Sequence, residues 1–410
     1  MKRIAVVGSG IAGMCSAYYL SRHYEVTLFE AADYLGGHTH TVDIEHAGEK
    51  SAIDTGFIVF NDRTYPNFQR LLAELKVPYQ ETEMSFSVRN DKANLEYNGH
   101  SLATLFAQKR NLLRPAFWRL IRDILRFNKA AKQEINNPSA QTLGTFLEKG
   151  GYGPLFIENY LLPMGAAIWS MGLDDMRGFP LQFFAQFFEN HGLLDVANRP
   201  QWFTIAGGSS QYIAPLVAPF KERIHLNTPI HRIERFEGKV RLISDGQDWV
   251  FDEVVLACHS DQALKMLASP TALEQQVLGQ LGYSENSVLL HCDIGHLPKR
   301  QAAWASWNYR MGRSRDKAVV TYNMNILQRL NKKQHYLVTL NDEVAADTVL
   351  GRYQYAHPVY TLAAIGAQEK WQKISGVDGI HYCGAYWFSG FHEDGVKSAL
   401  RVCDALGVTP

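Results

Sequence analysis

"KRIAVVGSGIAGMCSAYYLSRHYEVTLFE", residues 2–30, determines the architecture of the whole chain. A β-branched run leads into a glycine-rich turn, a helical pattern follows the turn, and a second strand pattern ends the stretch. Gly8, Gly10 and Gly13 have the G-x-G-x-x-G spacing in the context it requires, after a strand and at the start of a helix. The stretch therefore predicts a β–α–β unit that binds a dinucleotide.

Each part of this unit has a physical role. Gly8 permits the tight turn, Gly10 lets the backbone approach a pyrophosphate, and Gly13 lets the helix pack close to the sheet. The phosphates are expected at the helix N-terminus, where free N–H groups and the helix dipole attract anions. Glu30 ends the second strand, where an acid accepts hydrogen bonds from ribose hydroxyls. The pattern is common to NAD and FAD sites and does not separate them.

Composition narrows the class of protein. A chain of 410 residues predicts two to three domains, at roughly 150 residues each. Hydrophobic residues make up 46% of the chain, which predicts an ordered globular core. Basic and acidic residues balance at 41 each, and this balance argues against nucleic acid as a partner.

Cysteine usage and hydropathy bear on the compartment. Five scattered cysteines without a C-x-x-C pair suit free thiols in a reducing compartment. The first residues show no signal-peptide pattern, and no window of about 18 apolar residues predicts a membrane span. We therefore expect a cytoplasmic protein.

Residues 30–60 carry a second pattern, "EAADYLGGHTHTVD" at 30–43 followed by "IDTGFIVF" at 53–60. It resembles the second fingerprint of the flavin amine oxidase superfamily, which includes monoamine oxidases, protoporphyrinogen oxidases and carotenoid desaturases. The family pattern has an acid, Gly-Gly-Arg, a Thr or Ser, and a later Asp-x-Gly. The matching residues here are Glu30, Gly36-Gly37, Thr39 and Asp54-Thr55-Gly56. The resemblance implies FAD as the cofactor.

The same region departs from the family at two positions. His38 and Ala32 stand where the family often has arginines. We therefore expect backbone N–H groups to neutralise more of the cofactor's charge than they do in relatives. No metal site is expected at His38, His40 and His46, because no second cluster with ligand spacing accompanies them. A cofactor-loop histidine with two surface neighbours is the better interpretation.

The resemblance implies an α/β fold with a Rossmann-like (GR2-type) FAD-binding domain, a discontinuous α+β substrate domain and a helical insert. Residues 61–200 are predicted as helices with few β-rich runs, and residues 285–365 carry strand patterns expected to complete the sheet of the substrate domain. As in the family, a strand near Ile230 is expected to bring a backbone group to the adenine. The expected bounds are 1–60, 200–284 and 366–410 for the FAD-binding domain, and 61–199 and 285–365 for the substrate domain.

"GAYWFSGFHEDGVKSAL", residues 384–400, is expected to complete the flavin site from the other end of the chain. It predicts a turn followed by a helix, and Glu393 and Asp394 suit the acid-preferring first turn. In the resembled family the matching motif points a backbone N–H, here near Gly395 and Val396, at the flavin C2 carbonyl. Phe391 stands where monoamine oxidases carry a tyrosine of the aromatic cage around the amine.

The same stretch also departs from the family pattern. Gly384-Ala385 replaces the frequent Gly-Asp or Gly-Glu, whose acid holds the ribityl chain, so that contact is expected from the backbone or from elsewhere. Monoamine oxidases carry a covalent cysteine just before the cage aromatic, but no cysteine lies between Gly384 and Phe391 here. We therefore expect FAD to bind non-covalently. Lys397 is expected to face solvent rather than to act as a base.

The candidate site residues form two sets. The predicted cofactor-binding residues are Gly8, Gly10, Ile11, Ala12, Gly13, Glu30, Ala31, Gly36, Gly37, His38, Thr39, Thr55, Gly56, Phe57, Ile230, Gly384, Ala385, Gly395 and Val396. The predicted substrate-facing residues are Phe391, Trp387 and Trp307. Trp307 belongs to the polar-aromatic stretch "WASWNYR" at 304–310, for which an ordinary half-buried strand is the alternative.

The predicted reaction is hydride transfer between a substrate and flavin N5, because the sequence offers no acid–base pair of obvious spacing. One candidate substrate is a small or aromatic amine. The other is an apolar, fatty acyl-type chain, which the Phe-, Leu- and Trp-rich insert at 101–195 would suit, although a plain core explains that composition equally. A third alternative is a non-catalytic flavin-binding redox sensor or a protein recruited to membranes.

Nearly the whole chain resembles a bacterial group of FAD-binding proteins within this superfamily. The shared motifs are "GGHTHTVD", "IDTGFIVFN", "AAIWSM" and "FHEDGV". Members of the group are associated with cyclopropane-type and methyl- or furan-fatty-acid modification. The resemblance favours an apolar or lipid substrate over an amine.

Residues 101–130 hold seven basic residues and one acid, Asp123. Apolar residues such as Phe117 and Leu120 fall on one face of the predicted helix, and Arg119 and Arg122 fall on another. A basic amphipathic helix can lie on an anionic membrane surface. A solvated face over a core helix is the alternative, so peripheral membrane contact stays open at this point.

Overall fold

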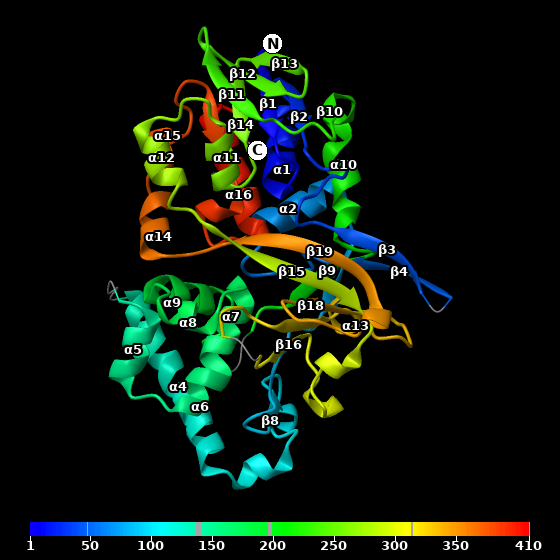
Figure 1. Cartoon of the computed structure of the whole chain (residues 1–410), viewed down its shortest axis with the longest axis vertical. Coiled ribbons are helices and arrows are strands. Elements are labelled where there is room, and N and C mark those ends of the chain that lie inside the picture. Colours follow the sequence, from blue (N-terminus) through cyan, green and yellow to red (C-terminus); the bar gives the residue numbers. More distant parts are fainter. Residues whose placement is uncertain (47, 137–140, 196–198, 313–314, 410) are drawn as a thin grey trace.

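A five-stranded parallel sheet forms the upper part of the molecule in Figure 1. The computed structural model describes residues 1–46, 48–136, 141–195, 199–312 and 315–409. In spatial order the strands are β10 (Ile224–His225), β2 (Glu25–Phe29), β1 (Arg3–Val7), β14 (Glu253–Leu256) and β20 (Ile380–Tyr382). All neighbouring pairs run parallel, and the inner strands are apolar because both faces of the sheet are covered.

Helix α1 (Ile11–Leu20) begins directly after the glycine turn that follows β1, and it is almost entirely buried. A Cβ on Gly13 would lie 1.9 Å from the carbonyl oxygen of Gly8, so only glycine lets this helix approach the strand so closely. On its other side α1 packs against α16 (His392–Ala405), the last helix of the chain. The predicted β–α–β unit is thereby confirmed, and the two ends of the chain form one unit.

A seven-stranded mixed sheet forms the lower part of the molecule (Figure 1). In spatial order its strands are β19 (Val349–Pro358), β15 (Tyr283–His291), β18 (Leu337–Leu340), β17 (Val320–Asn323), β16 (Trp307–Arg310), β7 (Phe86–Asn90) and β8 (Leu95–Asn98). β16 and β7 run parallel, and the other neighbours run antiparallel. The long strands β15 and β19 cross the middle of the molecule, beneath the parallel sheet.

Residues 79–98 correct the expectation that the chain from 61 to 200 has few β-rich runs. They form β6 (Tyr79–Thr82), β7 and β8. The stretch alternates polar and apolar residues only over short runs, so its local pattern is weak. Pairing of β7 with β16, which lies more than 200 residues later, makes it a strand, and such pairing is invisible to a local reading.

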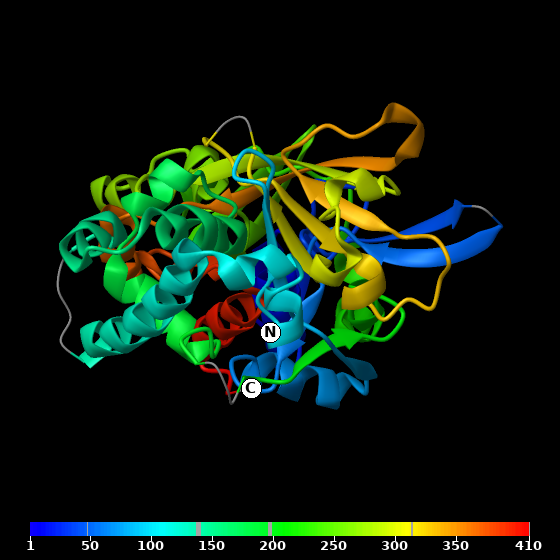
Figure 2. The same ribbon diagram turned by 90° about the horizontal axis from the view of Figure 1, so that it is seen from below.

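Helices cover the seven-stranded sheet at the lower left of Figure 1, and Figure 2 shows them from below on one side of the sheet. They are α4 (Pro115–Asn136), α5 (Leu143–Gly150), α6 (Pro154–Phe156), α7 (Leu162–Trp169), α8 (Leu173–Arg177) and α9 (Leu181–Asn190). The face of α4 with Phe117 and Leu120 is buried, whereas Arg119 and Arg122 are exposed. The amphipathic pattern predicted for this helix is confirmed.

Smaller elements connect these layers. The remaining strands are β3 (Thr41–His46) with β4 (Glu49–Asp54), β5 (Val59–Asn61) with β9 (Trp202–Ile205) and β6, and the meander of β11 (Arg232–Phe236), β12 (Lys239–Ser244) and β13 (Gln247–Phe251). The remaining α-helices are α2 (Pro66–Leu75), α3 (Leu102–Leu105), α10 (Ile213–Val217), α11 (Ser260–Met266), α12 (Ala272–Leu278), α13 (Met324–Leu327), α14 (Leu362–Gln368) and α15 (Trp371–Ile374). The bounds assigned to the two domains stay a prediction.

Among the described residues, no helix combines the length and the apolar composition that spanning a membrane requires.

Glu393 ties the last helix to α2. Its carboxylate accepts hydrogen bonds from the backbone N–H groups of Asn67 and Phe68, at 3.1 and 2.9 Å, and from the side-chain amide of Asn67 at 2.6 Å. The acid predicted to start its own helix therefore satisfies the N-terminus of a neighbouring one. Asp394 is the residue that caps α16, because its carboxylate accepts from the N–H of Phe391 at 3.0 Å.

Replacing Glu393 by alanine should lower the free energy of unfolding by about 3 kcal/mol, because it leaves donors at the start of α2 without an acceptor. Urea denaturation of the purified protein measures the change. Asp404→Ala, an exposed acid near the far end of the same helix, is the control and should stay within about 0.5 kcal/mol of the parent. Equal effects of the two variants would contradict this role of Glu393.

Candidate functional site

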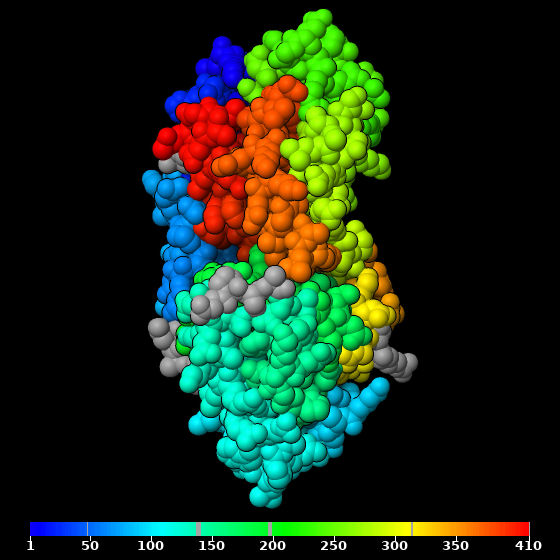
Figure 3. Space-filling model, turned by 90° about the vertical axis from the view of Figure 1, so that its left-hand side faces the viewer, coloured from blue at the N-terminus to red at the C-terminus, as the bar shows by residue number. Residues whose placement is uncertain are grey.

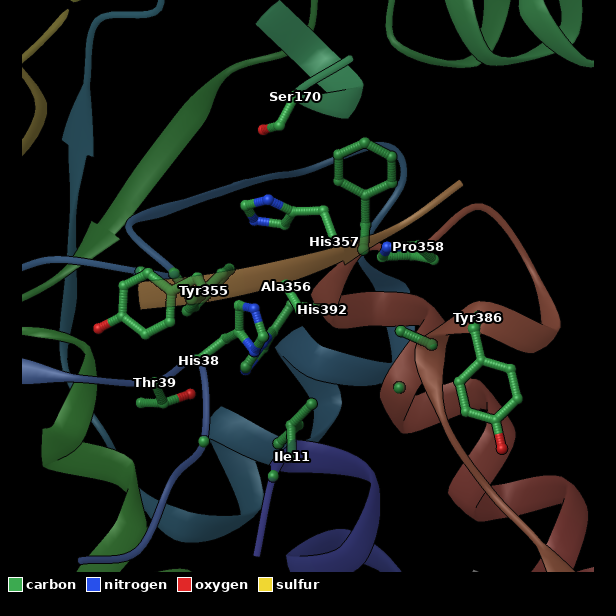
Figure 4. Close-up of a pocket in the computed structure, with 18 of the residues that line it drawn as sticks. Ile11, His38, Thr39, Ser170, Tyr355, Ala356, His357, Pro358, Tyr386 and His392 are labelled. Atoms are coloured by element: carbon green, nitrogen blue, oxygen red, sulfur yellow. The ribbon is translucent and has the colours of Figure 1, made fainter. Parts of the chain in front are cut away.

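A cavity of about 810 Å³ lies between the parallel sheet and the seven-stranded sheet, and Figure 4 shows part of its wall. Its size falls within the range of about 300–1,000 Å³ that is usual for ligand sites. All the predicted cofactor-binding residues line it except Gly13 and Val396. The cavity therefore gathers segments from both ends of the chain and from its middle.

Gly13 and Val396 lie behind the cavity wall. Gly13 faces the backbone of Gly8, and its role is the close packing of α1 on β1. Val396 is buried in the core beneath α16, whereas its neighbour Gly395 lines the cavity. A Cβ on Gly395 would lie 2.7 Å from a methyl carbon of Ile11, so this glycine lets α16 approach the start of α1.

The phosphate end of the cavity is built around Gly10. A Cβ placed there would meet no atom within 4 Å, so the space in front of this residue is open. Gly36 lies beside it in a short bridge, and its N–H donates to the carbonyl of Ser9 at 3.1 Å. The Gly-Gly loop thus lies against the first glycine turn, at the N-terminus of α1. This arrangement offers N–H groups and the helix dipole to an anion.

Glu30 is held in place by its own chain. One carboxylate oxygen accepts from the N–H and the hydroxyl of Ser9, at 2.8 and 2.6 Å, and the other accepts from the N–H of Ala32 at 2.9 Å. A carboxylate offers about four lone-pair positions, so acceptor capacity remains toward the cavity that Glu30 lines. This geometry suits the predicted contact with ribose hydroxyls.

Buried histidines replace charged groups around the cavity. Burial lowers the pKa of His38 to about 3, with a further decrease from the neighbouring imidazoles of His357 and His259. Burial likewise lowers the pKa of His392 to about 3 and that of His357 to about 4. These rings are neutral at physiological pH, so His38 does not supply the positive charge of the arginine that it replaces.

The first turn of α16 is fixed to the Gly-Gly loop through aromatic and hydroxyl contacts. The His392 ring stacks on Phe57 with 3.7 Å between ring centroids, and its Nε2 lies 3.0 Å from the Tyr212 hydroxyl. That hydroxyl lies 2.5 Å from the hydroxyl of Thr39. The helix N-terminus is thereby held at the cavity, where its dipole favours negative charge on a ligand.

Two of the three residues predicted to face the substrate line the cavity, and the third does not. Phe391 lines the cavity and stacks on Phe187, with 4.8 Å between ring centroids. Trp307 also lines the cavity, and its buried indole N–H has no hydrogen-bond partner among the described residues. Trp387 does not line the cavity, which corrects that prediction. It is 2% exposed and lies in the core of the parallel-sheet unit, because the turn that precedes α16 directs its side chain inward.

The end of β19 was missed by the sequence analysis. Tyr355 and His357 line the cavity there, and Tyr360 follows them in the chain. Figure 4 shows this strand passing over His38 and His392, with Ser170 on the facing side. The alternation in "YQYAHPVY" at 353–360 was a usable strand signal, but only the fold brings it beside the Gly-Gly loop.

Tyr386 stands next to Ala385, where the family's ribityl-binding acid is absent. Its side chain is 3% exposed and lines the cavity, and its hydroxyl has no hydrogen-bond partner among the described residues. A buried polar group without a partner costs free energy unless a ligand satisfies it. The open space at Gly10 and this hydroxyl both suit a large polar ligand in the cavity.

Comparison with known families gives an extended match. The family described as flavin containing amine oxidoreductase matches residues 11–292 of this chain. That region begins with α1 and includes the Gly-Gly loop and β14.

Two curated relatives match parts of the chain. Carotenoid phi-ring synthase from Chlorobaculum tepidum is 43% identical over 65 residues, which are 16% of this chain and 10% of that protein. L-amino-acid oxidase from Pseudechis australis is 23% identical over 281 residues, which are 65% of this chain and 52% of that protein. The chain therefore spans at most about half the length of these relatives.

Two solved structures share the fold over nearly their whole length. Cyclohexylamine oxidase from Brevibacterium oxydans has a TM-score of 0.71 at 15% identity, with 99% of each chain covered. A CLA-producing fatty acid isomerase from P. acnes has a TM-score of 0.70 at 14% identity, with 98% of each chain covered. At this identity the likeness establishes the fold alone.

Two glycine variants should separate the cofactor site from the packing beneath it. Gly10→Ala should leave the stability of the flavin-free protein within about 0.5 kcal/mol of the parent, because its Cβ enters open space. It should weaken flavin binding at least about tenfold, since the methyl group occupies the position of a close backbone approach. Flavin fluorescence titration and urea denaturation measure the two effects.

Gly13→Ala is the matched comparison. Its Cβ would collide with the Gly8 carbonyl, so the flavin-free protein itself should lose several kcal/mol of stability, of the order seen for overpacking. If Gly10→Ala bound flavin as tightly as the parent, the phosphates would not sit at this turn.

Proposed function

The chain belongs to the family of flavin-containing amine oxidoreductases, and on that premise we propose that it is a FAD-dependent enzyme that acts on an apolar, fatty acyl-type substrate. FAD would lie in the cavity with its pyrophosphate at the N-terminus of α1 and its ribose at Glu30. When bound, FAD supplies an N5 atom that exchanges a hydride with the substrate. The chain's own residues bind, orient and exclude water around that exchange.

The chemistry of the cavity wall carries this proposal. Among its described lining residues Glu30 is the only acid, and its carboxylate is already engaged by Ser9 and Ala32. A protonated amine would thus lack a carboxylate partner in the rest of the cavity. The wall beyond the predicted flavin segments is instead largely apolar or aromatic, for example Met164, Ile168, Phe187 and Leu193. Such a wall favours burial of a hydrocarbon chain.

Two elements would shape the reaction. Phe391 and Phe187 stack at the wall and keep water from the reacting atoms, which protects reactive species from hydrolysis. The N-terminus of α16 would stabilise negative charge on the reduced cofactor through its dipole. No step requires a titrating side chain, which agrees with the neutral histidines around the cavity.

Amine oxidation is the second candidate function, and the names of the relatives point both ways. Cyclohexylamine oxidase and L-amino-acid oxidase act on amines by name, whereas carotenoid phi-ring synthase and the fatty acid isomerase act on apolar chains. Their identities or matched lengths are too low to decide between these classes. The single acid in the cavity wall favours the apolar substrate.

Non-covalent attachment of the flavin is part of the same proposal. Cys258 is the cysteine found among the described lining residues. Burial, followed by the nearby acids, raises the pKa of its thiol to about 12. A thiol that stays protonated at neutral pH is a poor nucleophile.

Anaerobic reduction of the bound flavin tests the proposed substrate class. Unsaturated or methylated fatty acyl lipids should bleach the flavin absorbance near about 450 nm, the band of the oxidised cofactor. Benzylamine and cyclohexylamine serve as the amine arm and should leave the band unchanged. Bleaching by amines alone would overturn the lipid proposal, and bleaching by neither class would favour a non-catalytic flavin-binding protein. Dithionite provides the control for full reduction.

We also propose that the end of the molecule formed by α3, α4 and the turn between them contacts an anionic membrane surface. Figure 3 shows this region as the lower end of the molecule. Leu113 is 88% exposed and Leu102 is 77% exposed, and the other exposed apolar side chains nearby are Leu112, Trp118 and Leu125. The basic residues of the same region are Lys109, Arg110, Arg114, Arg119, Arg122, Arg126 and Lys129. Apolar side chains surrounded by basic ones fit an anionic lipid surface.

Contacts hold this surface together and connect it to the cavity. The Trp118 indole donates to the carbonyl of Leu112 at 2.9 Å, and its ring lies 5.5 Å from that of Phe106. Phe106 in turn packs on Phe117, which packs on the cavity-lining Tyr97. Two aromatic layers thus lie between the exposed surface and the cavity wall at Tyr97.

Vesicle co-sedimentation tests the membrane contact. The protein should sediment with phosphatidylglycerol vesicles at low salt. It should stay in the supernatant when about 0.5 M NaCl is added, or when phosphatidylcholine vesicles replace the anionic ones. The double variant Leu102→Asp with Leu113→Asp should bind at least about tenfold more weakly, since two leucines no longer enter the lipid. Leu362→Asp, which changes a leucine 52% exposed on α14, is the control. Absence of binding at low salt would refute the proposal.

A further inference from the structure

His357 lines the cavity at the end of β19, where it projects into the space beneath Ser170 (Figure 4). Its two ring nitrogens have different surroundings. Nδ1 lies 3.0 Å from the side-chain nitrogen of Asn286. Nε2, on the other side of the ring, has no hydrogen-bond partner among the described residues. The hydrogen bonds of Asn286 and Asn341 determine which nitrogen of this ring carries the proton.

Asn341 is the anchor of that environment. Its side-chain oxygen accepts from the N–H of Ser287 at 3.2 Å, and its nitrogen donates to the carbonyl of Ala318 at 3.0 Å. Backbone N–H groups only donate and carbonyls only accept, so these two bonds fix which end of the amide is oxygen. The Asn341 nitrogen therefore donates, at 2.7 Å, to the side-chain oxygen of Asn286.

Asn286 passes this orientation to the histidine. Its oxygen faces the Asn341 donor, and its nitrogen donates to the carbonyl of Ser284 at 3.0 Å. The group facing His357 Nδ1 is therefore an NH2 group, which donates hydrogen bonds and cannot accept one. Nδ1 must present its lone pair, so the proton of the neutral ring sits on Nε2. Asn286 is fully buried, and solvent does not compete for these bonds.

The ring also resists a second proton. Burial, followed by the charge that His259 would carry, lowers the pKa of His357 to about 4. Protonation at Nδ1 would in addition break the bond from Asn286. At neutral pH His357 is therefore a single, fixed N–H donor aimed into the cavity.

We propose that His357 donates its Nε2–H to a hydrogen-bond acceptor of the bound ligand, and that Asn286 and Asn341 are positioning residues that set its tautomer. A carbonyl oxygen or ring nitrogen of the flavin is one source of such an acceptor. A carboxylate oxygen of an apolar acid is the other, and that alternative rests on the function proposed above. Ser170 adds a polar group on the facing side in a strained left-handed conformation, with φ of 53°.

The flavin arm of the test uses the holoenzyme without substrate. His357→Phe removes one hydrogen bond to the reduced flavin. Binding of the reduced flavin should therefore weaken about tenfold relative to binding of the oxidised flavin. For a two-electron couple this shifts the reduction potential by about −30 mV. His23→Phe, an exposed histidine outside the cavity, should leave the potential unchanged.

The substrate arm measures the binding of decanoate to the holoenzyme. The change that decanoate causes in the flavin absorbance spectrum reports its affinity. If the acceptor belongs to the substrate, His357→Phe should bind decanoate about tenfold more weakly while the flavin potential stays unchanged. His357→Gln keeps a donor near the Nε2 position and should recover part of the lost effect. If both the potential and the decanoate affinity stay unchanged in His357→Phe, the proposal is overturned, whatever the substrate class proves to be.

Nitrogen-15 NMR of histidine-labelled holoenzyme tests the positioning role directly. The parent should show His357 protonated at Nε2 and not at Nδ1. Asn286→Asp replaces the NH2 group by a carboxylate oxygen, which accepts a hydrogen bond, so His357 should become protonated at Nδ1. A purely structural role for Asn286 would leave the tautomer unchanged in this variant. A parent ring protonated at Nδ1 would overturn the inference.

Discussion

The contact between α1 and the turn after β1 is the constraint on which the rest of the structure depends. A side-chain carbon on Gly13 would lie 1.9 Å from the Gly8 carbonyl oxygen, so the helix can start where it does only with glycine there. This start places the helix N-terminus at the carboxyl ends of the parallel strands, where ligands bind in such sheets. The Gly-Gly loop and the first turn of α16 pack against the same point, and they convert one anion site into a cavity for a whole dinucleotide.

Neutrality is the second property of this cavity. Burial holds the pKa values of His38, His357 and His392 far below their usual range, so these rings act as hydrogen-bonding groups without charge. At these histidines, negative charge on a ligand meets neutral N–H donors, and the backbone N–H groups and helix dipoles nearby add to them. Such fixed dipoles need no reorganisation during a reaction, and they leave the remaining wall free to be apolar. The same wall offers little to a charged amine.

The N-terminal unit and the last helix could be predicted from the sequence because their signals are local. Glycine spacing, an acid at a strand end and an acidic helix start each lie within a few residues of the group they act on. The role of Glu393 was missed because its partners belong to α2, far away in the chain. β7 and β8 were missed because pairing with β16 makes them strands. Trp387 was misplaced for a related reason, since one turn of backbone decides whether an aromatic faces the cavity or the core.

The crystal structure of the FAD-bound enzyme tests this account most directly. We expect the pyrophosphate at Gly10 and the N-terminus of α1, a ribose hydroxyl on Glu30, and the flavin ring between α16 and the end of β19, within reach of the His357 Nε2. No covalent bond should join the flavin to Cys258. A pyrophosphate bound away from Gly10, or a flavin ring outside the cavity, would contradict the account.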